Sequence, residues 1–123
     1  MKKHYDCIIA GFGTAGAVAA IAAGRSGVSV LVLERNTCPG GTHTAGGVCW
    51  YYMQKPVGIM AELDRICYGR SPETAPTASF AELKKHVIEE EAAKAGVTVR
   101  YEAAISRCGM ENGIIREIFW TDP

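Results

Sequence analysis

Residues 5–35 read YDCIIAGFGTAGAVAAIAAGRSGVSVLVLER, and this stretch decides the fold. Residues 5–10 form a short, partly β-branched apolar run, which is typical of a strand buried on both faces of a parallel sheet. Residues 17–26 are mostly small or apolar with good helix propensity, and Gly27 is placed to cap the C-terminus of that helix. A second β-branched run covers residues 28–33. The stretch therefore predicts a strand, a helix and a strand, the βαβ unit of an α/β fold.

Three glycines, Gly11, Gly13 and Gly16, join the first predicted strand to the helix. A bare G-x-G-x-x-G is weak evidence, but this one follows a strand, opens a helix and precedes an acid at the end of the next strand. Gly11 permits a tight turn, Gly13 lets the backbone approach a pyrophosphate, and Gly16 lets the helix lie close to the sheet. The N–H groups of Thr14, Ala15 and Gly16 would then point at the phosphates, helped by the helix dipole. The pattern predicts binding of a dinucleotide.

Glu34 ends the second predicted strand, twenty-three residues after Gly11. A carboxylate at this position can accept hydrogen bonds from ribose hydroxyls, and it would repel a 2′-phosphate. We therefore expect a ligand other than NADP. The alternative interpretation is that the glycines serve packing alone and that Glu34 is a surface charge.

The rest of the chain alternates loops with further elements. We expect a loop over residues 36–47, a helix from 56 to about 68, a linker over 71–77, a helix from 79 to 96, a strand over 97–101 and a hairpin of 104–108 with 114–120. Ser79 and Glu82 have the spacing of a capping box. The acidic run 89–91 is interpreted as a solvated helix face, and no metal site is predicted.

Composition sets the class of protein. The chain has 123 residues and is 48% hydrophobic and 21% charged, which indicates one globular domain. Thirteen basic and thirteen acidic residues cancel, so neither nucleic acid nor an anionic membrane surface is expected as a partner. The five cysteines are odd in number and include no C-x-x-C pair, which favours reduced thiols and a cytoplasmic location.

The sequence from residue 5 to about 47 resembles the N-terminus of bacterial FAD-dependent oxidoreductases with the glutathione-reductase-type FAD fold. The resemblance is carried by the glycine turn, by Glu34 and by the later GG pair. It implies a Rossmann-like FAD-binding unit with a parallel sheet and a helical insertion over residues 48–96. The strand after that insertion would lie beside the second strand, and the hairpin would begin a β-meander. FAD is then the expected cofactor.

The same resemblance implies roles for single residues. Glu34 and Arg35 would lie at the AMP ribose. Gly40 and Gly41 would give a second backbone approach to FAD, with Thr42 near the pyrophosphate, and main-chain groups near Ala104 and Ile105 would meet the adenine. The family often has Met-Ala-Thr after the glycine pair, whereas this chain has Thr-His-Thr at 42–44.

Members of that family continue for several hundred residues and include a substrate domain. We therefore expect residues 1–123 to form a partial N-terminal FAD-binding domain that is inactive in isolation. Disulfide reductases of the superfamily carry two cysteines soon after the glycine pair, and only Cys49 lies there, so a redox disulfide is disfavoured. His43 is either a group at the flavin or a loop histidine bonded to backbone. The aromatic residues 50–52 either wall a flavin site or pack in the core.

Three functions follow from these patterns. The leading hypothesis is the FAD-binding portion of a flavin-dependent oxidoreductase, whose small-molecule substrate and catalytic residues are not predicted. The first alternative is a stand-alone nucleotide-binding or regulatory subunit that completes its site with a partner chain. The second alternative is a fragment of an NAD-dependent dehydrogenase, although the insertion after the second strand and the glycine pair suit FAD better.

Overall fold

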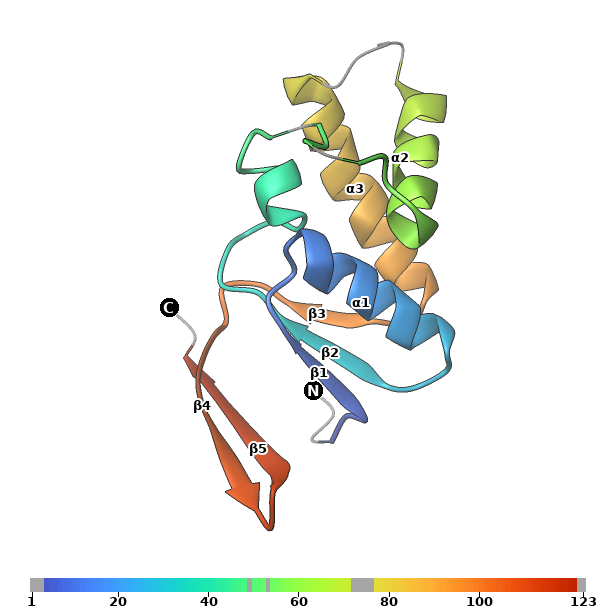
Figure 1. Ribbon diagram of the computed structural model, residues 1–123. Coiled ribbons are helices and arrows are strands. Elements are labelled where there is room, and N and C mark those ends of the chain that lie inside the picture. Colours follow the sequence, from blue (N-terminus) through green and yellow to red (C-terminus); the bar gives the residue numbers. More distant parts are fainter. Residues whose placement is uncertain (1–3, 49, 53, 72–76, 122–123) are drawn as a thin grey trace.

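The structure is a computed structural model and describes residues 4–48, 50–52, 54–71 and 77–121. Three helices cover one face of a small sheet, and a two-stranded hairpin leaves the sheet on the side away from the helices (Figure 1). The predicted α/β fold is confirmed. Within the described ranges, no helix is both long enough and apolar enough to cross a membrane.

The sheet is parallel and has the order β1-β2-β3, formed by Cys7–Ala10, Val30–Leu33 and Thr98–Arg100. Helix α1, Thr14–Arg25, connects β1 to β2, and Gly27 follows it with φ of 88° as the predicted left-handed C-terminal residue. The predicted βαβ unit is confirmed, and β3 lies beside β2 as the resemblance implied. The carboxyl ends of β1 and β2 therefore carry the glycines and Glu34 to one edge of the sheet.

Helices α2, Gly58–Arg70, and α3, Ala78–Lys94, lie between β2 and β3 in the chain and pack beside α1. The three helices and one sheet face enclose the main core: Phe12, Ala17, Ala20, Ile21, Val30, Val32, Leu63, Cys67, Phe80, Val87, Ile88 and Ala92. Burial of these side chains is the main force that holds the helical layer on the sheet. Both predicted helices are confirmed, each shifted by one or two residues.

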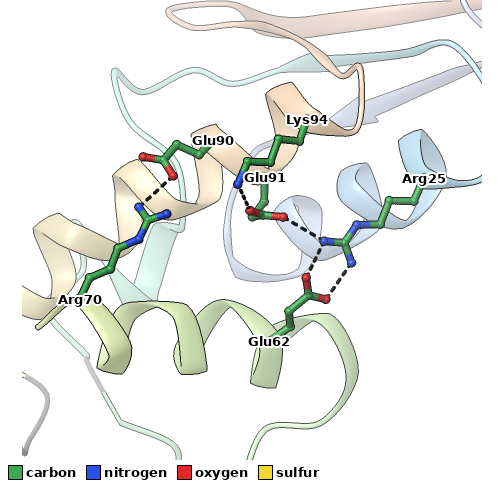
Figure 2. A network of polar contacts seen from close by, with 6 residues as sticks. All are labelled: Arg25, Glu62, Arg70, Glu90, Glu91 and Lys94. Atoms are coloured by element: carbon green, nitrogen blue, oxygen red, sulfur yellow. Dashed lines mark hydrogen bonds and ion pairs between the residues drawn. The ribbon is translucent and has the colours of Figure 1, made fainter.

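Ion pairs join the three helices at their edge (Figure 2). Arg25, in the last turn of α1, donates to both carboxylate oxygens of Glu62 at 2.7 Å and to Glu91 at 3.0 Å. Lys94 donates to Glu91 at 2.7 Å, and this bond is the largest cause that lowers the pKa of the Glu91 carboxyl. The prediction that residues 89–91 form a solvated face is therefore wrong for Glu91, which is buried because it turns toward Arg25.

The hairpin consists of β4, Ala104–Glu111, and β5, Ile114–Thr121. Asn112 and Gly113 both have positive φ, 51° and 78°, which is the geometry of a two-residue hairpin turn. The base of the hairpin covers the second face of the sheet over β2, where Ile105, Ile118 and Trp120 pack on Leu31 and Leu33. The predicted hairpin is confirmed.

The capping-box prediction at Ser79 and Glu82 is wrong. The N-cap of α3 is Thr77, whose hydroxyl accepts from the N–H of Phe80 at 3.4 Å, and Ser79 already lies inside the helix. Glu82 instead accepts from Lys85 at 2.6 Å, one turn further along. Of the predicted linker, residues 72–76 lie outside the described residues.

Candidate functional site

The turn that carries the three glycines, residues 11–16, is called the glycine turn below. Gly11 has φ of 95° and donates to the carbonyl of Leu33 at 2.8 Å, so it ties the end of β1 to the end of β2. Gly13 is the N-cap of α1 and forms no side-chain cap, so the first N–H groups of the helix face outward without an intrahelical partner. The first helical bond runs from the N–H of Ala17 to the carbonyl of Gly13 at 2.9 Å.

Two glycines of this turn have opposite surroundings. A Cβ at Gly16 would lie 2.1 Å from the carbonyl oxygen of Gly11, so only glycine lets α1 approach the strand this closely. A Cβ at Gly13 would meet nothing within 4 Å. Gly16 is thus required by the packing of the chain itself, whereas nothing in the described structure around Gly13 requires glycine.

Residues 39–48 form a second loop, called the glycine-pair loop below. Gly40 donates to the carbonyl of Phe12 at 2.7 Å, and its own carbonyl accepts from the hydroxyl of Thr14 at 2.9 Å. A Cβ at Gly41 would lie 3.0 Å from the Cα of Gly13. The structure therefore brings the glycine pair against the glycine turn, and Thr42 follows at once in the short 3-10 helix Gly41–His43.

Glu34 lies beside the glycine turn and is only 5% exposed, so its interpretation as a surface charge is wrong. One carboxylate oxygen accepts from the N–H of Phe12, and the other accepts from the N–H and the side-chain amide of Asn36 at 2.8 and 2.7 Å. These bonds fix the carboxylate at the glycine turn. Each oxygen can accept more than one hydrogen bond, so capacity for a hydroxyl donor remains.

The two other residues assigned by resemblance lie in different settings. Arg35 is exposed beside Glu34. Ile105 is half-buried, and its side chain packs in the hydrophobic cluster formed with Leu31 and Leu33 of β2. The main chain just before it comes closer, because Ala103 donates to the carbonyl of Glu34 at 2.9 Å and Glu102 donates to Asn36 at 3.2 Å.

A cavity of about 610 Å³ opens beside the start of α1. The cavity is open to solvent, and its lining includes Thr14, Ala15 and Val18 of α1 together with Tyr51 and Met60. Its lining is mostly apolar, although Gln54 and Lys55 also contribute to it, so the cavity suits a mainly hydrophobic group.

Behind Tyr51 lies a polar cluster that the sequence did not reveal, called the Lys84 cluster below. The ammonium of Lys84, with a side chain 2% exposed, lies 2.6 Å from Oδ1 of Asp64 and donates to the Tyr51 hydroxyl at 3.1 Å. That hydroxyl donates to Oδ2 of Asp64 at 2.7 Å. Within the described part of the chain Oδ1 accepts no hydrogen bond, so its contact with the ammonium is an ion pair rather than a directed bond. One feature of the sequence could have indicated that Lys84 is buried, because Lys84 lies on the same face of the helix as Phe80 and Val87.

Of the other aromatic residues in this segment, Trp50 and Tyr52 are 59% and 93% exposed, contrary to the core-packing interpretation. Tyr51 is half-buried and lines the cavity. Cys49, the cysteine considered for redox chemistry, lies outside the described residues.

His43 sits at the end of the short helix in the glycine-pair loop. Its ring meets the Tyr51 ring edge-on, with centroids 4.7 Å apart and planes at 79°. Among the described residues its Nδ1 is buried and has no hydrogen-bond partner, so this nitrogen does not bond to backbone. Burial, and next the charge of Lys84, lower the pKa of His43 below its usual value. The folded protein therefore favours the neutral imidazole of His43.

Stability should depend on pH through His43. The unfolded chain protonates this residue near pH 6.5 and the folded chain only at lower pH, so the folded state is fully stable above that pH and loses stability as pH falls below it. We expect His43→Gln to show a smaller fall in melting temperature between about pH 7.5 and 5.5 than the wild type. His86→Gln, on the exposed face of α3, is the control and should follow the wild type. Equal slopes for all three proteins would remove His43 as the cause.

Comparison with known proteins connects this geometry to a family and to solved folds. A family model described as FAD dependent oxidoreductase matches residues 6–122. THI4 from Thermovibrio ammonificans is 27% identical with a TM-score of 0.61, over 94% of this chain and 48% of that one. The 3-ketosteroid-delta4-(5alpha)-dehydrogenase from Rhodococcus jostii RHA1 is 18% identical with a TM-score of 0.65, over 96% and 42%.

A thioredoxin reductase from Lactococcus lactis is 22% identical with a TM-score of 0.61, over 98% of this chain and 32% of that one. At these identities the dehydrogenase and the reductase show likeness of fold alone. No curated protein matches the chain. The chain spans less than half the length of each of the three solved proteins.

Proposed function

The chain belongs to the FAD dependent oxidoreductase family, with FAD as its cofactor, and we propose that it holds the ADP moiety of FAD between the glycine turn and the glycine-pair loop. The observation that carries this proposal is the contact of the two loops. Gly41 lies against Gly13, while the position of a Cβ at Gly13 stays open. The resulting cradle leaves bare backbone where a pyrophosphate needs it.

Each predicted site residue has a proposed role in this cradle. The N–H groups of Thr14, Ala15 and Gly16 bind the pyrophosphate at the positive end of α1, and Thr42 approaches it from the other loop. Glu34 accepts from a ribose hydroxyl with the remaining lone pair of the oxygen that also accepts from Phe12.

Two further roles rest on the resemblance rather than on a contact. Arg35 lies outside the ribose, and the main chain leading into Ile105 meets the adenine. FAD, when bound, supplies the redox chemistry, and these residues bind and orient it.

The proposal is tested by titrating the full-length protein with FAD, NAD and NADP and following flavin fluorescence and melting temperature. We expect tight binding of FAD, weak binding of NAD and none of NADP. Glu34→Gln should weaken FAD binding about tenfold, because it replaces a charge-assisted acceptor with a neutral one. Glu82→Gln, an exposed acid on α3, is the control. A protein that binds NAD more tightly than FAD would favour the NAD-dependent dehydrogenase instead.

A second proposal concerns the activity of the whole protein. We propose a flavin-dependent oxidoreductase in which residues 1–123 are the N-terminal FAD-binding part, residues 48–96 its helical insertion, and the substrate is a small molecule bound elsewhere. Among the described strands β1 pairs only with β2, and Ile8 on its second face is 38% exposed. An open edge with exposed apolar side chains supports completion of this sheet by further polypeptide.

That polypeptide is either the continuation of the same chain or, in the alternative function, a partner chain that shares the site. Size-exclusion chromatography of the protein purified from its native cells separates the two. Elution with a second polypeptide would favour the nucleotide-binding subunit. A cytoplasmic location remains part of the proposal and is supported by the free thiols of the four described cysteines.

A further inference from the structure

Tyr51 makes contacts in three directions at once. Its hydroxyl lies between Lys84 of α3 and Asp64 of α2, at 3.1 and 2.7 Å. Its ring packs against His43 of the glycine-pair loop. It also lines the cavity beside Thr14 at the start of α1. Tyr51 therefore connects helices α2 and α3 to the glycine-pair loop, which contacts the glycine turn.

The Lys84 cluster would destabilise the fold if one of its buried charges lost its partners. Lys84 and Asp64 are almost fully buried, and each buried charge needs its partners to offset the loss of water. The Tyr51 hydroxyl serves both, since it accepts from the ammonium and donates to the carboxylate. A swing of Tyr51 away from α3 would leave both charges with one partner fewer. The cluster thus holds Tyr51, and with it the His43 contact, in one position.

We infer that Tyr51 is a positioning residue: through Lys84 and Asp64 it fixes the glycine-pair loop against the glycine turn and so shapes the FAD cradle. For its effect on FAD the inference rests on the proposed function. For its effect on the loop it does not, because the loop can be observed without ligand.

The loop offers a defined readout in hydrogen exchange. The N–H groups of His43, Thr44, Gly46, Gly47 and Val48 all donate to carbonyls within the loop, at 2.9 to 3.2 Å. In Tyr51→Phe of the full-length protein without FAD, we expect these amides to exchange about tenfold faster, because the variant loses both hydrogen bonds that the Tyr51 hydroxyl makes to charged groups. Peptides from α1 should keep their wild-type rates.

Tyr101→Phe is the matched control, because the Tyr101 hydroxyl also donates to a carboxylate, that of Glu89, at 2.7 Å but on the exposed surface. It should leave loop exchange unchanged. Unchanged exchange in Tyr51→Phe, or equal acceleration in both variants, would overturn the inference.

The second arm measures FAD release by stopped flow. Dissociation should be several-fold faster from Tyr51→Phe than from the wild type or Tyr101→Phe, because the loosened loop frees the pyrophosphate more often. Faster loop exchange with an unchanged dissociation rate would confine Tyr51 to the loop and reject its role in the cradle. If the wild type binds no FAD, the proposed function fails, and the exchange experiment still decides whether Tyr51 holds the loop.

Discussion

Gly13→Ala should fold as well as the wild type and lose FAD affinity about a hundredfold. The added methyl meets no atom within 4 Å, and the φ of −71° at this residue is open to alanine. The same methyl would stand where the backbone approaches the pyrophosphate, and the loss of one or two charge-assisted bonds of about 1.5–3 kcal/mol each corresponds to that factor. The melting temperature without ligand tests whether the variant folds as well as the wild type, and FAD titration tests the loss of affinity.

Gly16→Ala should instead destabilise the fold itself. Its methyl would lie 2.1 Å from the Gly11 carbonyl oxygen, so α1 must move away from the strand. We expect a loss of about 3 kcal/mol of folding free energy and a fall of about 10 °C in melting temperature, before any ligand is added.

A control for the substitution itself is Gly69→Ala in α2, where nothing lies within 4 Å and alanine is the better helix former. It should keep both stability and FAD affinity. Equal destabilisation by Gly13→Ala and Gly16→Ala would contradict the division of roles, and full FAD affinity in Gly13→Ala would place the pyrophosphate elsewhere.

The glycine turn could be predicted from sequence because its determinants are local. The requirement for glycine at Gly16 arises from an atom only five residues away, in Gly11, and Glu34 is marked by its place after a strand. The resemblance implied that Gly40 and Gly41 approach FAD, but the contact of Gly41 with Gly13 was not predicted, since the composition of a loop does not state which neighbour it touches.

The Lys84 cluster could not be predicted, because its members come from three separate segments. The place of Lys84 on the apolar stripe of α3 indicates that it is buried, but it does not reveal that α2 places Asp64 opposite it. Glu91 illustrates the same limit, since a run of three acids indicates a solvated face unless Arg25 of another helix is known to be near. Tertiary contacts between charged side chains leave no periodic pattern in the sequence.

Lys84→Met tests how much the structure depends on this cluster. The substitution removes a buried ammonium and leaves the Asp64 carboxylate, 9% exposed, with the Tyr51 hydroxyl as its hydrogen-bond partner among the described residues. Breaking one side of a buried ion pair typically costs about 3–5 kcal/mol, so we expect the largest loss of stability of any substitution considered, measured by urea denaturation. Lys85→Met is the control, because its ion pair with Glu82 lies at the surface, where such pairs contribute about 0–1 kcal/mol.

The double variant Lys84→Met/Asp64→Leu separates two explanations of that loss. If the cost comes from the orphaned carboxylate, removal of both charges should restore most of the stability, because buried ion pairs are often replaced by apolar residues at little cost. If the ion pair itself stabilises the fold, the double variant should be no more stable than Lys84→Met. We expect recovery of stability, and with it a loop that exchanges faster than in the wild type, since Tyr51 then has no charged partner to hold it. Stability and loop order would thus be uncoupled, as they must be if the buried charges serve to position Tyr51 rather than to stabilise the helices.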